Sequence, residues 1–182
     1  MGWKSKRTVM QRYDLTANMY DERYSEEQKT KYKAALKNLD LAGGVVIDVG
    51  CGSGLSFGYV STQASVVVGI DVSRKLLRKA KEQARAYGNT FVLQADADHL
   101  PFRDGFFDFV FAFTVLQNMP QPAETLDELK RATKANGKVV VTGLKKAIPL
   151  EKFAGQLEKS GMNLVSFLDS DELKCYISVL VR

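Results

Sequence analysis

Short apolar runs rich in branched residues alternate along the chain with segments that carry apolar residues at helical spacing. The apolar runs cover residues 45–49, 65–71, 90–95, 107–113 and 138–144. The segments of helical period cover residues 73–87, 123–134 and 149–160. Apolar runs without polar alternation are typical of strands buried on both faces, and their alternation with helices is typical of βαβ units. The pattern therefore predicts an α/β protein with a mostly parallel sheet.

Both ends of the sequence differ from this repeating pattern. Two β-prone runs, 163–169 and 174–181, flank a short polar turn, which favours an antiparallel hairpin at the end of the sheet. Residues 28–39 predict a helix, and basic residues interleaved with tyrosines precede it. Because no repeat or flexible linker interrupts the chain, we expect a single domain in which residues 1–40 form a basic, tyrosine-rich helical lid over residues 41–182.

Composition excludes several classes of protein. The chain has 182 residues, 45% of them hydrophobic, and a formal net charge of +5, which permits a polyanionic partner without requiring one. Two cysteines and a single histidine cannot build a disulfide framework or a multi-histidine metal centre, so we expect no metal. No apolar run approaches the roughly 18 residues that suggest a membrane span. We therefore expect a cytoplasmic protein with no membrane partner.

A glycine-rich loop and three acidic residues follow the first strands of the predicted sheet. Glycines occupy alternate positions in residues 50–54, directly after the first strand. Asp48 lies two residues before that loop, and Asp71 and Asp96 end the second and third strands. Because the carboxyl ends of parallel strands meet at one edge of the sheet, these groups should line one crevice. Asp71, about 20 residues beyond the loop, suits an acid that accepts the hydroxyls of a ribose.

The spacing of the glycines separates two classes of nucleotide ligand. A dinucleotide fingerprint, G-x-G-x-x-G, would require glycine at position 55, where this chain has Leu55. A carboxylate at Asp48 favours a ligand with a cationic group over a pyrophosphate. The loop therefore favours a ribose-bearing cation, and a dehydrogenase remains the weaker alternative.

Four runs of sequence together resemble the successive motifs of class I S-adenosylmethionine-dependent methyltransferases. These runs are VVIDVGCGSG, VVVGIDVS, LQADADHLPFRDGFFDFVFAFTVLQNMP and ATKANGKVVVTG. The run YDLTANMYDERY also resembles the start of the ubiquinone-biosynthesis-like members (methyltransferase domain 11-like), in which a leading helix covers the cofactor. The resemblance implies a Rossmann-like three-layer sandwich, with a seven-stranded, mostly parallel sheet whose last strand is antiparallel. It also implies S-adenosylmethionine as cofactor, S-adenosylhomocysteine as product, and residues 41–182 as the methyltransferase domain.

The resemblance assigns parts of the cofactor to particular positions. It places the methionine part among Asp48 and residues 50–54, the ribose on Asp71, the adenine edge on Asp96 with the next residue, and the methyl-transfer side at residues 113–114. The implied cofactor-binding residues are Tyr20, Asp48, Gly50, Cys51, Gly52, Ser53, Gly54, Asp71, Val72, Asp96, Ala97, Phe113 and Thr114.

The residues that act on the acceptor are harder to predict. A sulfonium already activates its methyl group, so few catalytic side chains are needed, and the sequence offers no obvious general base. His99, the only histidine, precedes Leu100-Pro101 and suits a loop or packing role. Gln117, Asn118 and Tyr13 are candidates for contact with the acceptor, although the first two equally suit ordinary polar positions before a turn.

Two classes of acceptor fit the sequence. The basic, tyrosine-bearing start of the chain favours RNA, and the compact core resembles ribosomal-RNA and tRNA methyltransferases that work with a small zinc-binding activator protein. The alternative acceptor is a small molecule, such as a quinone precursor, enclosed beneath the lid. No DNA partner is expected. A non-catalytic subunit that retains the cofactor fold is an alternative of another class, although three intact acids argue against it.

Overall fold

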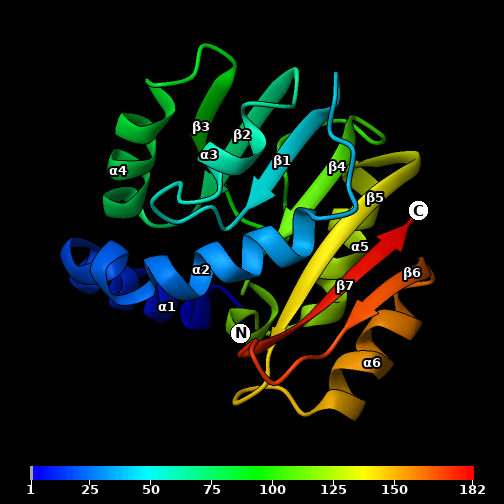
Figure 1. Cartoon of the computed structure of the whole chain (residues 1–182). Coiled ribbons are helices and arrows are strands. Elements are labelled where there is room, and N and C mark those ends of the chain that lie inside the picture. The colour runs from blue at the N-terminus through cyan, green and yellow to red at the C-terminus, as the bar shows by residue number, and fades with distance from the viewer. Residues whose placement is uncertain (1) are drawn as a thin grey trace.

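The computed structural model describes the backbone of residues 2–182 and, apart from residues 2, 18 and 20–24, their side chains. Seven strands form one sheet in the order β3-β2-β1-β4-β5-β7-β6 (Figure 1). The strands are β1 (Val45–Val49), β2 (Val66–Asp71), β3 (Thr90–Gln94), β4 (Phe107–Ala112), β5 (Thr133–Leu144), β6 (Asn163–Leu168) and β7 (Cys175–Val181). The first five run parallel, whereas β7 is antiparallel to both β5 and β6. The predicted sheet, including its antiparallel last strand and terminal hairpin, is confirmed.

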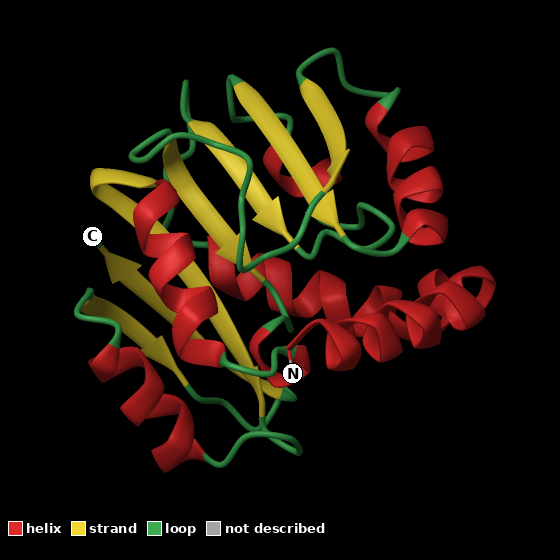
Figure 2. Ribbon diagram, turned by 180° about the vertical axis from the view of Figure 1, so that it is seen from behind, coloured by secondary structure: helices red, strands yellow, loops and turns green. Residues whose placement is uncertain are grey.

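Helices cover both faces of this sheet and complete three layers (Figure 2). The helices that follow the sheet strands are α3 (Phe57–Val60), α4 (Arg74–Ala84), α5 (Pro122–Ala132) and α6 (Leu150–Lys159). On one face, α5 and α6 bury residues such as Leu129 and Phe153 in one apolar cluster. On the other, α3 and α4 bury Phe57 and Ala80 in a second cluster. Ser73 caps the start of α4, because its hydroxyl accepts the amide of Leu76 at 3.2 Å.

Two helices cross the carboxyl ends of the parallel strands and cover that edge of the sheet (Figure 1). They are α1 (Gly2–Thr16) and α2 (Tyr20–Leu36), joined by the short 3-10 turn η1 (Ala17–Met19). The buried residues Tyr32 and Ala35 of α2 join the same apolar cluster as α3 and α4. This cover extends the helix predicted at 28–39 toward the N-terminus and adds α1, which the hydrophobic pattern did not reveal. Among the described helices, none is long and apolar enough to cross a bilayer.

The boundary between α5 and β5 differs from the predicted one. The helix was expected to reach residue 134, but α5 ends at Ala132 and β5 begins at Thr133. Thr133 pairs with Phe107 of β4 before the register shifts. Pairing with the neighbouring strand therefore outweighs the helical propensity of this short segment.

Candidate cofactor and acceptor site

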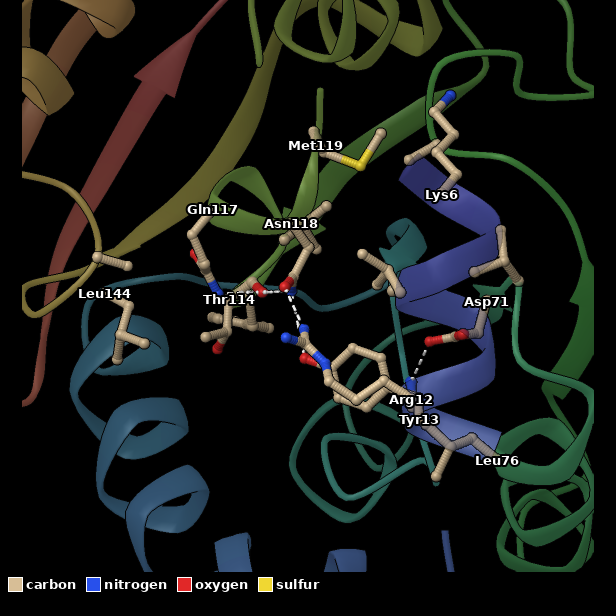
Figure 3. A pocket seen from close by; sticks show the side chains of 18 of the residues that line it. Lys6, Arg12, Tyr13, Asp71, Leu76, Thr114, Gln117, Asn118, Met119 and Leu144 are labelled. Atoms are coloured by element: carbon tan, nitrogen blue, oxygen red, sulfur yellow. Dashed lines mark hydrogen bonds between the residues drawn. The ribbon is translucent and has the colours of Figure 1, made fainter. Parts of the chain in front are cut away.

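A pocket of about 720 Å³ opens where the first four strands end and α1 and α2 pass over them. The strand ends contribute Gly50 after β1, Asp71 of β2, Asp96 after β3 and Thr114 after β4. Its volume is in the range of small-molecule sites in proteins. Figure 3 shows Asp71 and Lys6 toward one end and Thr114, Gln117 and Leu144 toward the other, so the pocket has two chemically different ends.

The glycine loop forms a tight backbone turn beneath the pocket. Gly50 and Gly52 have φ angles of 74° and 58°, in the left-handed region that side chains disfavour. The amides of Gly50 and Cys51 both donate to the carbonyl of Ile70, at 2.8 and 2.9 Å. These bonds tie the loop to β2 and bring the backbone of Gly50 and Gly52 to the pocket wall.

Asp71 joins the loop to the start of α4. One carboxylate oxygen accepts the amide of Gly52 at 3.0 Å, and the other accepts the amide of Ser73 at 2.8 Å. Burial raises the pKa of Asp71, although the amides of Ser73, Gly52 and Val72 oppose that rise by stabilising the charged form. Asp14 of α1 lies close by and accepts the Ser73 hydroxyl at 2.5 Å, so α1 docks beside this carboxylate.

Asp48 is the most deeply buried acid of the site. Its side chain is only 2% exposed, and Ser56 donates its hydroxyl to Oδ2. Oδ1 has no hydrogen-bond partner among the described residues. Burial, with a smaller contribution from the charge of Asp71, raises the pKa of Asp48 to about 7, although the Ser56 hydrogen bond lowers it. A buried carboxylate oxygen without a donor is costly, and the raised pKa reflects that cost.

Lys6 of α1 forms ion pairs with the two acidic residues that follow β3, Asp96 and Asp98. Its ammonium lies 2.7 and 2.8 Å from the two oxygens of Asp96 and also pairs with Asp98, although Lys6 itself is 8% exposed. Burial lowers the pKa of Lys6, but the two carboxylates outweigh it and the net pKa is raised. A buried ion pair of this geometry fixes the start of α1 over the end of β3.

The opposite end of the pocket is organised around Thr114. This residue has a φ of 62°, an uncommon conformation for a β-branched side chain. Its amide donates to Thr142 Oγ1 at 2.8 Å, and its carbonyl accepts the side-chain amides of Gln117 at 2.5 Å and Asn118 at 3.1 Å. These bonds hold a backbone conformation that the residue alone would not favour.

Asn118 also connects this end of the pocket to α1. Arg12 donates to its Oδ1 at 2.9 Å, and its Nδ2 donates to the hydroxyl of Tyr13 at 3.2 Å (Figure 3). The guanidinium of Arg12 lies 5.2 Å from the centre of the Tyr13 ring. Polar contacts from α1 therefore reach both ends of the pocket.

Comparison with known proteins identifies the family. A family model described as a methyltransferase domain matches residues 47–141, just over half of the 182 residues. The chain belongs to the S-adenosylmethionine-dependent methyltransferases. The matched segment runs from β1 into β5 and contains the glycine loop and all three acids.

Curated relatives of this family member act on different acceptors. The chain is 32% identical over 142 residues to the malonyl-[acyl-carrier protein] O-methyltransferase of Marinomonas sp. (strain MWYL1), covering 76% of the chain and 52% of that protein. It is 32% identical over 119 residues to the demethylmenaquinone methyltransferase of Staphylococcus saprophyticus, covering 63% and 51%. The chain thus spans about half the length of these relatives.

Solved methyltransferase structures share the fold of the chain. Magnesium protoporphyrin IX methyltransferase (ChlM) from Synechocystis PCC 6803 with bound SAM has a TM-score of 0.78 at 19% identity, covering 98% of the chain and 97% of that one. The methyltransferase in complex with the Haloferax volcanii Trm112 methyltransferase activator has a TM-score of 0.79 at 18% identity, covering 93% and 96%. At these identities the likeness establishes the fold.

Most of the residues singled out from the sequence meet at this methyltransferase-family pocket. Those that line it are Tyr13, Gly50, Gly52, Asp71, Val72, Asp96, Ala97, Phe113, Thr114, Gln117 and Asn118. Asp48, Cys51, Ser53 and Gly54 do not line the pocket. All four are buried, and the side chain of Tyr20 lies outside the described part of the structure. The individual role of each residue stays a prediction.

Lys31 of α2 is a polar group of this site that the sequence reasoning missed. Its side chain is 1% exposed, and its Nζ lies 2.7 Å from Thr114 Oγ1 and 3.2 Å from Gln28 Oε1. A signal was present, because Lys31 shares the buried face of a helix with Gln28, Tyr32 and Ala35. Lysine is almost never fully buried unless its ammonium has a partner, so a lysine on the buried face of a helix indicates a specific polar contact.

Proposed function

We propose that the chain binds S-adenosylmethionine across the ends of β1, β2 and β3 and transfers its methyl group to a small-molecule acceptor. The observation that carries this proposal is the placement of Asp71, which lines the pocket beside the glycine loop. The Asp71 oxygens accept the amides of Gly52 and Ser73, and the amide of Val72 also stabilises the carboxylate; its remaining acceptor capacity suits a hydroxyl of a ribose. A test must therefore establish which ribose-bearing ligand binds to Asp71.

The two ends of the cofactor would find complementary groups. Asp48 is buried and does not line the pocket, so its carboxylate would favour a cationic methionine end through its charge. The adenine edge would lie against Asp96 and Ala97, where Lys6 now contacts both oxygens of the carboxylate. Gly52 has no side chain to fill the space beside Asp71, which suits close approach of a ligand.

The cofactor supplies a methyl group that its positively charged sulfur already activates. The remaining task of the chain is to hold the acceptor in line and to exclude water. Helices α1 and α2 cover the pocket, and Gln117 and Asn118 border its acceptor end with fixed side-chain amides. These groups orient an acceptor; they do not attack the methyl group themselves.

The contacts of α1 favour a small acceptor over the RNA that the sequence favoured. Of the basic residues at the start of the chain, Lys6 is buried and paired with Asp96 and Asp98, and Arg12 points its guanidinium to Asn118 at the pocket. A cation that is already paired within the protein, as Lys6 is, contributes little attraction to phosphates outside it. The names of the curated relatives, which include a quinone and a malonyl-carrier methyltransferase, support the same choice.

Calorimetry and methyl transfer from tritiated S-adenosylmethionine test this proposal together. We expect micromolar binding of S-adenosylmethionine and S-adenosylhomocysteine, no binding of NAD, and label in the organic-soluble fraction of a cell extract. Label in the RNA fraction alone, with or without an added zinc-binding activator protein, would establish the RNA alternative instead. Cofactor binding without transfer to any fraction would favour the non-catalytic subunit. A cytoplasmic location stays a prediction.

A further inference from the structure

Lys31 is buried at the acceptor end of the pocket, next to the residues that line it. Its three polar neighbours, Thr114, Gln28 and Glu27, all belong to the pocket wall. The shortest contact, 2.7 Å, joins Lys31 Nζ to Thr114 Oγ1. One hydroxyl therefore separates a buried amine from the space where an acceptor would bind.

Thr114 is held in an uncommon backbone conformation by several hydrogen bonds. Its φ of 62° is strained for a β-branched residue, and hydrogen bonds fix its amide, its carbonyl and its hydroxyl. Strained backbone that the surroundings hold in place is concentrated at functional sites. In this conformation the Thr114 hydroxyl contacts Lys31 beside the pocket.

The electrostatic surroundings of Lys31 allow it to lose its proton. Burial lowers the pKa of its ammonium, and Lys174 lowers it further. Glu27 and Cys175 oppose that shift, but Glu27 is 4.0 Å away and lies closer, at 3.0 Å, to Lys174. The only carboxylate that pairs with Lys31 among the described residues is thus shared with a second cation. A buried lysine with so weak a counter-charge can serve as a base.

We propose that Lys31 is a positioning residue that takes up the proton of the acceptor through the hydroxyl of Thr114. This inference rests on the proposed methyl transfer. The acceptor atom forms its bond to the methyl carbon as the carbon–sulfur bond breaks and its electron pair stays on sulfur. The proton of the acceptor passes to Thr114 Oγ1, whose own proton passes to the lone pair of Lys31 Nζ. The resulting ammonium then loses its proton to solvent.

The protonation of Lys31 can be measured without any acceptor. In protein labelled with ¹⁵N and ¹³C at lysine side chains, NMR titration should show one lysine with a pKa below the ordinary value of 10.5 that is absent from Lys31→Met. Thr114→Val should lower that pKa further, because the ammonium loses its 2.7 Å acceptor, whereas Thr114→Ser should leave it close to its original value. A Lys31 pKa at or above 10.5 would overturn the proposal.

Kinetics then test the direction of proton movement. Transfer of tritiated methyl groups to the organic-soluble extract should increase with pH through the pKa that NMR assigns to Lys31. Lys31→Met should bind S-adenosylmethionine as wild type does but transfer about 100-fold more slowly, without that rise. Lys31→Arg, which stays charged, should be equally slow, and Lys33→Met, at an exposed position of the same helix, should match wild type.

The outcomes separate this inference from the proposed function. A Lys31→Met variant that keeps the wild-type pH profile would overturn the relay and leave methyl transfer intact. Loss of cofactor binding by wild type would instead refute the proposed function. If Lys31→Met fails to fold, Thr114→Val against Thr114→Ser decides the same question, since only the first removes the hydroxyl.

Discussion

At Asp48, the stability of the fold favours the protonated carboxyl, whereas the binding of a cation favours the charged carboxylate. Its carboxyl is 2% exposed and has a pKa of about 7. This folded-state pKa lies above the unfolded value of about 3.9, so the folded chain binds the proton more tightly. The stabilisation is therefore greatest at acidic pH and falls as the pH rises from about 4 to about 7.

The substitution Asp48→Asn isolates this effect. The amide keeps an oxygen that can accept from Ser56 but does not titrate. Applying the linkage between pH 5 and pH 8 gives a loss of roughly 2–3 kcal/mol for the wild-type carboxyl. We therefore expect the free energy of unfolding of Asp48→Asn, relative to wild type, to improve by roughly 2–3 kcal/mol over that interval.

Urea unfolding at pH 5, 6, 7 and 8 measures this difference, with Asp127→Asn on the exposed face of α5 as the control. Calorimetry on the same variants should show that the substitution weakens cofactor binding. We expect S-adenosylmethionine to bind to Asp48→Asn at least tenfold more weakly than to wild type at pH 8. A stability difference that is the same at every pH would show that Asp48 does not titrate. Unchanged cofactor affinity would remove it from the cation site.

Three further substitutions test the cofactor end of the pocket. Asp71→Ala should weaken S-adenosylmethionine binding by roughly 10²- to 10⁴-fold, since two charged hydrogen bonds of roughly 1.5–3 kcal/mol each are lost, whereas Asp127→Ala should not; equal affinities in calorimetry would contradict the assignment. Lys6→Met should release α1 from Asp96 and speed cofactor association about tenfold in stopped-flow fluorescence of the single tryptophan, and an unchanged rate would show that the ion pair does not hold the pocket closed. Gly50→Ala, at a φ of 74°, should lower the free energy of unfolding by roughly 1–3 kcal/mol in urea, and a loss below about 0.5 kcal/mol would refute the steric argument.

The sheet could be predicted from the sequence because its information is local. Buried strands such as 45–49 are unbroken apolar runs, and Ser73 stands where a helix cap is needed. The glycine loop and the acids Asp71 and Asp96 follow directly, because parallel strands end at the same edge. Topology alone was thus enough to bring these groups to one pocket.

A helical lid over residues 1–40 was predicted, but the docking of α1 and the role of Lys31 could not be, because their information is not local. Helix α1 carries few apolar residues and docks through polar contacts such as Lys6 to Asp96, which are 90 residues apart. Hydrophobic periodicity cannot detect such a contact. Lys31 lies in a predicted helix, but its meaning depends on Thr114, which is 83 residues away.

Both covering helices reach the acceptor end of the pocket, and their contacts meet at Thr114. Helix α2 contacts the Thr114 hydroxyl through Lys31, whereas Arg12 and Tyr13 of α1 contact Asn118, which donates to the Thr114 carbonyl. The same helix α1 holds the cofactor end through Lys6 and Asp14. Because sites that share partners are energetically coupled, loosening α1 at Lys6 should change the Lys31 titration as well as the rate of cofactor association. A Lys31 titration that is identical in Lys6→Met and wild type would show that the two ends of the pocket act independently.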